Sequence, residues 1–109
     1  MDTLASKVKS ILRKEGHISI MKLIEGGEYT SEEVLVEAIR INHSDLVDML
    51  MDEYVELRTT PQILDKIFYL TNLTHIPKLK QTVLSYLPSA LRVKYSNLRL
   101  ASALKNETA

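Results

Sequence analysis

Short runs of apolar residues at helical spacing, each ended by a turn residue, limit what this chain can fold into more than any other feature. Leu4, Val8, Ile11 and Leu12 recur at i, i+4, i+7 and i+8, which is the spacing of one face of an amphipathic helix. Three Gly and three Pro among 109 residues are too few for the many tight turns of a β-sandwich. The sequence therefore predicts an all-α fold of about seven short helices.

Turn residues divide these predicted helices into pairs. The first pair should span approximately residues 3–25, the second 31–53 and the third 60–87, and a C-terminal capping helix over 89–104 should close the series. Gly16 separates the two helices of the first pair, because glycine suits the left-handed position after a helix. The chain has the length of one domain and contains no long linker, so its 109 residues are expected to form a single helical domain.

Capping residues and chain breaks indicate where several helices begin and end. Thr30 followed by Glu33 has the spacing of a capping box. Asn42 or Ser44 is expected to cap the fourth helix, and residues 71–74 are expected to interrupt the third pair. The core should be centred on three apolar residues of the fourth helix, Leu46, Val47 and Leu50.

Two of the three histidines begin similar strings of sequence. Counting from His17 and from His43, apolar residues stand at offsets 3, 4, 6 and 7 in both strings. A turn residue precedes each histidine, Gly16 in the first string and Asn42 in the second. This similarity between two parts of the chain predicts an internal repeat, in which each helix pair is one structural unit.

These strings resemble the ankyrin-repeat family. Residues 38–51 are similar to the core of a repeat, where a helix ending in small residues precedes Gly-His and a helix with paired aliphatic residues. Residues 16–27 are similar to the second helix and closing glycine of another repeat, and Thr60-Pro61 to the opening of a third. The resemblance covers residues 4–87 in part, because the spacings between histidines are 26 and 32 whereas the family's period is about 33. It implies stacked helix-turn-helix pairs that form a small solenoid. A compact helical bundle is the alternative.

The net charge of zero hides an asymmetry between the two halves of the chain. Residues 1–57 carry six Lys or Arg against twelve Asp or Glu, and residues 58–109 carry eight against two, so the halves have net charges of −6 and +6. Such a split indicates interaction surfaces rather than a fold. The candidate partner-binding residues are therefore a basic set and an acidic set, Arg92, Lys94 and Arg99 in the first and Glu32, Glu33 and Glu37 in the second.

The sequence contains no signature of an enzyme or of a metal site. It has no Cys, no nucleophile elbow, no phosphate-binding glycine loop and no dinucleotide fingerprint. His17, His43 and His75 fit no ligand motif, and on stacked repeats their positions would lie roughly 10 Å apart. We expect them to close the turns between paired helices by hydrogen bonds to the backbone, with no cofactor or metal bound.

These observations predict a non-catalytic protein–protein interaction module that inhibits or scaffolds a protein partner, as the extended surfaces of helical repeats do. The alternative is a small nucleic-acid-binding protein that uses the basic C-terminal half. Self-association, with the −6 half of one copy against the +6 half of another, is a further alternative. The N-terminus lacks a signal-peptide core and the longest apolar stretch is four residues, so we expect a cytoplasmic protein that does not span a membrane.

Overall fold

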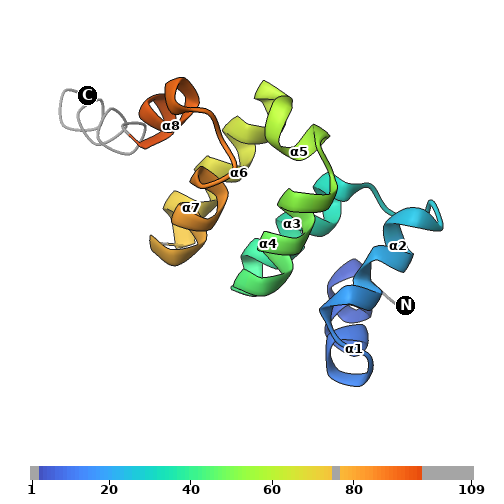
Figure 1. Ribbon diagram of the computed structural model, residues 1–109. Helices are drawn as coiled ribbons and strands as arrows, with labels where there is room; N and C mark the ends of the chain where they lie inside the picture. The colour runs from blue at the N-terminus through green and yellow to red at the C-terminus, as the bar shows by residue number, and fades with distance from the viewer. Residues whose placement is uncertain (1–2, 75–76, 97–109) are drawn as a thin grey trace.

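The computed structural model describes residues 3–74 and 77–96, and all regular structure in these ranges is helical (Figure 1). The all-α prediction is confirmed. The elements of the described residues are α1 (Leu4–Lys14), the 3₁₀ turn η1 (His17–Ile20), α2 (Met21–Glu25), α3 (Ser31–Arg40), α4 (Ser44–Glu53), α5 (Glu56–Thr59), α6 (Pro61–Thr74), α7 (Pro77–Leu84) and α8 (Ser89–Ser96). Within the same ranges no helix is long and apolar enough to cross a lipid bilayer.

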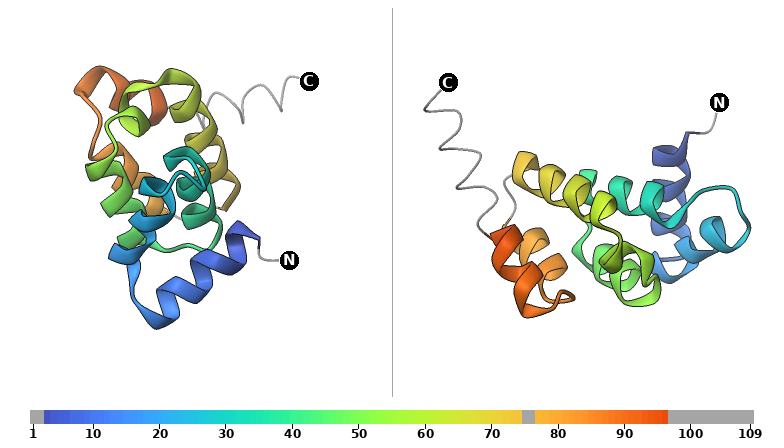
Figure 2. Two further views of the ribbon diagram at one scale, coloured as in Figure 1. Left: turned by 90° about the vertical axis from the view of Figure 1, so that its right-hand side faces the viewer. Right: turned by 90° about the horizontal axis from the view of Figure 1, so that it is seen from above.

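The helices form pairs, and each pair stacks on the next. Helix α1 packs against η1, α3 against α4, and α6 against α7. Between pairs, α1 contacts α3 and η1 contacts α4, and then α3 contacts α6 and α4 contacts α7. Viewed from above in Figure 2, α1, α3 and α6 lie along one row and α2, α4 and α7 along the other. Helix α8 contacts α7 at the far end of the stack from α1.

The hydrophobic core runs through all three pairs. Leu46, Val47 and Leu50 of α4 are fully buried, as predicted, because α4 is covered by α3, by η1 and by α7. At the C-terminal end, the rings of Phe68 and Tyr95 stack with their centroids 4.4 Å apart. Tyr95 therefore joins α8 to α6 and closes the core at that end, with roughly the extra energy of a stacked aromatic pair beyond the area it buries.

The start of α3 follows from a local motif. The Thr30 hydroxyl accepts a hydrogen bond of 3.1 Å from the backbone N–H of Glu33, and the Glu33 carboxylate accepts one of 3.0 Å from the backbone N–H of Thr30. The predicted capping box is thus confirmed. Two N–H groups that the helix itself cannot satisfy are paired in this way.

Two helix boundaries differ from the expectation. Residues 71–74 do not interrupt the third pair, because they form the last turn of α6. The buried Thr71 hydroxyl donates a 3.0 Å hydrogen bond to the carbonyl of Phe68, so this polar side chain is satisfied within the helix. The short helix α5 was not predicted either, since its one turn is too short for an apolar periodicity.

Candidate functional site

The three predicted acidic residues all lie on α3, and each has a partner within the chain. Glu33 belongs to the capping box. Glu32 forms an ion pair with Lys66 of α6, with 3.4 Å between the carboxylate oxygen and Nζ. The Glu37 side chain is only 13% exposed and lies 3.9 Å from the Arg40 guanidinium. Two of these carboxylates therefore have structural roles, whether or not they also bind a partner. Glu33 stabilises the start of α3, and Glu32 stabilises the contact between α3 and α6.

Two residues of the predicted basic set, Arg92 and Lys94, lie on α8, at the far end of the stack from α1. The Arg92 Nε donates a 2.7 Å hydrogen bond to the carbonyl of Leu87. The Lys94 Nζ lies 5.1 Å from the centroid of the Tyr95 ring, within the range of a cation–π contact. Arg99 lies outside the described residues. Arg92 and Lys94 thus remain exposed but already have contacts near their own helix.

The outward face of α6 exposes two large apolar side chains. Tyr69 is 62% exposed and Leu73 is 57% exposed, and they stand four residues apart, on the same side of the helix. The sequence analysis missed this pair. The available signal was the continuous apolar run at residues 67–70, because four consecutive apolar residues cannot all lie on the one face of a helix that the core covers.

Polar contacts lie on both sides of this exposed face. Lys66, three residues before Tyr69, reaches Glu32 of α3. Asp65, four residues before Tyr69, accepts a 2.6 Å hydrogen bond from the Tyr95 hydroxyl of α8. Helix α6 is therefore held by α3 on one side and by α8 on the other, and this arrangement gives Tyr69 a fixed position on the surface.

The two described histidines lie at equivalent turns but differ in their contacts. The Nδ1 of His43 accepts a 3.0 Å hydrogen bond from the backbone N–H of Leu46, so His43 has the predicted backbone partner. No hydrogen bond joins the His17 ring to any residue that the structure describes. The ring centroids of His17 and His43 are 6.1 Å apart, closer than the expected 10 Å, because η1 packs directly against α4.

His43 is also the residue that caps α4, so the assignment of this cap to Asn42 or Ser44 was wrong. Asn42 has a φ of +57°, the left-handed conformation that ends α3, whereas an N-cap residue needs an extended backbone. His75 lies outside the described residues. Within those residues, no three His, Cys, Asp or Glu side chains are grouped so that they could hold a metal ion.

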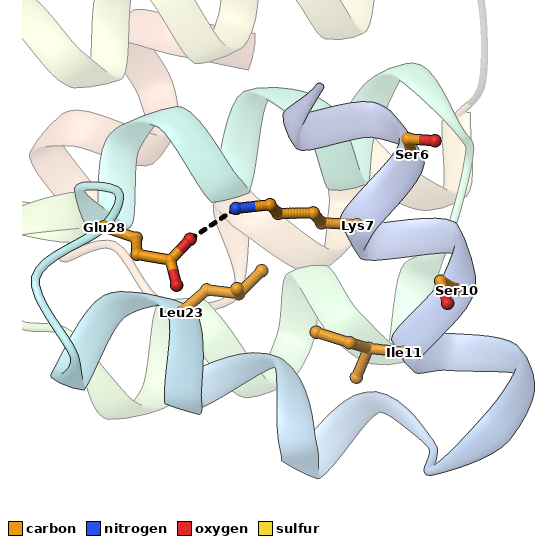
Figure 3. A pocket seen from close by; sticks show the side chains of 6 residues that line it. All are labelled: Ser6, Lys7, Ser10, Ile11, Leu23 and Glu28. Atoms are coloured by element: carbon orange, nitrogen blue, oxygen red, sulfur yellow. Dashed lines mark hydrogen bonds and ion pairs between the residues drawn. The ribbon is translucent and has the colours of Figure 1, made fainter. Parts of the chain in front are cut away.

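A hollow of about 310 Å³ lies between α1 and the segment around α2 (Figure 3). Its apolar lining comes from Ile11 and Leu23. Across the hollow, the Lys7 Nζ lies 2.6 Å from a carboxylate oxygen of Glu28, and this hydrogen bond raises the pKa of Lys7 above its usual value. Two serines of α1 complete the lining, Ser6 and Ser10.

The cations of α1 change the interpretation of the charge split. Helix α1 holds four Lys or Arg and no Asp or Glu, whereas residues 15–57 hold eleven Asp or Glu and two Lys or Arg, a net charge of −9. The acidic half of the sequence thus begins with a basic helix. Since α1 and α8 lie at opposite ends of the stack, acidic helices separate the two basic ends.

Comparisons of the chain with protein-family models, with curated proteins and with solved structures find no match. The function therefore has to be inferred from the exposed side chains of the described residues. Among the described residues, the face of α6 combines exposed apolar area with a backbone held on both sides. Exposed aromatic and aliphatic groups on a rigid element are typical of surfaces that bind other proteins.

Proposed function

We propose that this chain is a non-catalytic protein–protein interaction module that binds a partner protein through the exposed face of α6. The observation that carries the proposal is the pair Tyr69 and Leu73, 62% and 57% exposed and one turn apart. Fully burying a large apolar side chain contributes about 1.5–3 kcal/mol, so this pair would supply an apolar centre for an interface. Tyrosine is moreover among the residues that most often dominate binding energy at interfaces.

The arrangement of the helices supports this proposal. Stacked helix pairs leave an extended surface along each row of helices, and such surfaces are used for recognition in helical repeat proteins. Gly16 and Asn42, with φ of +98° and +57°, each precede the histidine of an equivalent turn. This equivalence supports the further proposal that the pairs are ankyrin-like repeats of short period, as the sequence resemblance implies.

Nucleic-acid binding by the basic C-terminal half remains the alternative function. The charge distribution favours a protein partner instead, because the basic ends α1 and α8 are separated by a segment with a net charge of −9. A polyanion that followed the stack from one end to the other would pass these carboxylates. The basic residues of the C-terminal half would therefore have to bind nucleic acid without those of α1.

The proposal is tested with Tyr69→Ala/Leu73→Ala and with a matched control, Ile18→Ala/Val93→Ala, which truncates two side chains that are 70% and 62% exposed. Each purified variant and the wild type are immobilised and exposed to an extract of the organism that encodes the chain. Captured proteins are identified by mass spectrometry. We expect a protein that the wild type and the control retain and that Tyr69→Ala/Leu73→Ala loses.

The variants must also melt within a few degrees of the wild type, because exposed truncations should cost little stability. A partner retained equally by all three chains would contradict the assignment to α6. Capture that disappears after nuclease treatment of the extract would favour the alternative function.

A further inference from the structure

The outer face of α1 carries cations that nothing in the described part of the chain neutralises. Lys9, Arg13 and Lys14 are exposed and form no ion pair with any described residue, whereas Lys7 is held by Glu28. Lys9 and Arg13 lie on the same side of the helix, because residues four apart are neighbours along its surface, and Lys14 lies about 100° further around the helix axis. Three basic side chains thus face solvent within about two turns of one helix.

The same face is hollowed. A depression of about 310 Å³ is framed by these three cations together with Ser6 and Ser10. Both serines also line the hollow between α1 and α2, whose apolar lining is Ile11 and Leu23 (Figure 3). The two depressions therefore have Ser6 and Ser10 in common as lining residues. We call this combined area the α1 surface.

We propose that the α1 surface binds an acidic peptide segment of another protein. In this arrangement an apolar side chain of the segment lies over Ile11 and Leu23, and its carboxylates lie against Lys9, Arg13 and Lys14. The serine hydroxyls between them can donate hydrogen bonds to carboxylates or to the backbone of the segment. This surface is separate from the face of α6, so either of the two can be disproved without the other.

The size and the electrostatic surroundings of the α1 surface favour a short acidic segment over a nucleic acid. From Ser6 to Lys14 the helix rises only about 12 Å. Beyond it, the elements packed against α1 belong to residues 15–57, which have a net charge of −9. A nucleic acid carries phosphates along its whole length and would meet these carboxylates, whereas a short segment ends before it reaches them.

Two-dimensional ¹H–¹⁵N NMR of the full chain tests the proposal, because this method detects weak binding and locates it. The probe is a short synthetic peptide of glutamates with one central leucine. Two further peptides distinguish the apolar contribution to binding from the electrostatic one. The first has alanine in place of the leucine, and the second has lysines in place of the glutamates. We expect chemical-shift changes at amides of α1 and α2 that saturate with the first peptide, are weaker with the alanine peptide and are absent with the lysine peptide.

Two variants and a control test whether Lys9, Arg13 and Ser10 contribute to binding of the acidic peptide. Lys9→Glu/Arg13→Glu should weaken binding at least about tenfold, since two favourable charge contacts become repulsive. Ser10→Trp fills the shared rim without changing the charge and should also weaken binding. The control Lys78→Glu/Lys94→Glu makes the same change in net charge on α7 and α8, and it should bind as the wild type does.

Four results would overturn the proposal. One is the absence of shift changes on α1 and α2 at millimolar peptide, and another is equal binding by Lys9→Glu/Arg13→Glu and the control. The third is a single-stranded oligonucleotide that binds the same amides more tightly than the acidic peptide, which would assign the surface to nucleic acid. Shift changes that grow with protein concentration alone, together with faster sedimentation, would instead identify a second copy of the chain as the occupant.

Discussion

Two tyrosines of the second half direct their hydroxyl groups at aspartates of other helices. Tyr95, only 1% exposed, donates to Asp65, and Tyr86 donates to Asp48. Burial, followed by the hydrogen bond to Asp65, raises the pKa of Tyr95 to about 12. For Tyr86 the hydrogen bond to Asp48 is the larger cause, ahead of burial, and its pKa is also raised to about 12. In both cases the neutral phenol is favoured, because it donates a hydrogen bond to the carboxylate whereas the phenolate would be repelled by it and would lose part of its hydration.

We therefore expect the free energy of unfolding to fall as the pH rises from about 10 to about 12. An unfolded tyrosine loses its proton near pH 10 whereas Tyr95 keeps it, so the unfolded state gains an advantage throughout this window. The stabilisation is fully present below pH 10. Tyr95→Phe should be less stable than the wild type at neutral pH by about 1 kcal/mol, because it loses a hydrogen bond, and should depend less on pH above 10.

Urea unfolding curves at several pH values between about 8 and 11.5 measure this difference. The control is Tyr69→Phe, which removes the hydroxyl of an exposed tyrosine and should leave the dependence on pH as in the wild type. Parallel curves of stability against pH for Tyr95→Phe and the wild type would show that Tyr95 does not resist ionisation.

At the scale of single elements, α3 and α4 begin with different caps although they belong to the same pair. Helix α3 has a local Thr–Glu box, whereas α4 uses the ring nitrogen of His43. The equivalent His17 begins η1, where the N-cap is Gly16 and no side chain caps the turn. One residue type at two equivalent turns therefore has two different roles, and the ring that forms the hydrogen bond should matter more for stability.

His43→Ala should destabilise the fold by about 1 kcal/mol, the usual cost of losing an N-cap, because the backbone N–H of Leu46 loses its partner. His43→Asn should recover most of that loss, since asparagine is among the best N-cap residues. His17→Ala is the matched control and should cost less. Chemical denaturation followed by circular dichroism measures all three. Equal losses for the two alanine variants would mean that ring packing, and not the cap, determines the role of His43.

At the scale of the whole molecule, charge alternates along the stack. Helix α1 is basic, residues 15–57 are strongly acidic, and residues 58–96 carry six Lys or Arg against one Asp, a net charge of +5. The strong contacts of each pair are with its neighbours, so these charged regions lie in the order of the sequence. A neutral chain of this kind gains little long-range attraction to a polyanion.

We therefore expect binding to random-sequence DNA and RNA to be weaker than micromolar even at about 50 mM salt, where phosphate contacts are strong. Fluorescence anisotropy of labelled oligonucleotides measures this. The variant Arg92→Glu/Lys94→Glu should behave as the wild type does. Micromolar binding that disappears in this variant would establish the nucleic-acid alternative and displace the face of α6 as the main functional surface.

The sequence by itself determined the helical class and most helix boundaries. Gly16 after α1 and the capping box of Thr30 and Glu33 are both where the sequence predicts them. These features depend on interactions between residues three to five positions apart, which any stretch of chain with that sequence brings together. For the same reason the burial of Leu50 followed from the apolar spacing within its own helix.

Only the tertiary structure decided which polar groups are partnered and which apolar groups are left exposed. Asn42 could not cap α4, because its backbone takes the left-handed conformation that ends α3 and leads into the turn to α4. Tyr69 became a surface residue because α3 and α8 hold α6 on either side and leave that face uncovered. The exposure of Tyr69 depends on contacts between residues thirty or more positions apart. The periodicity of a single helix contains no information on which of its faces another helix will cover.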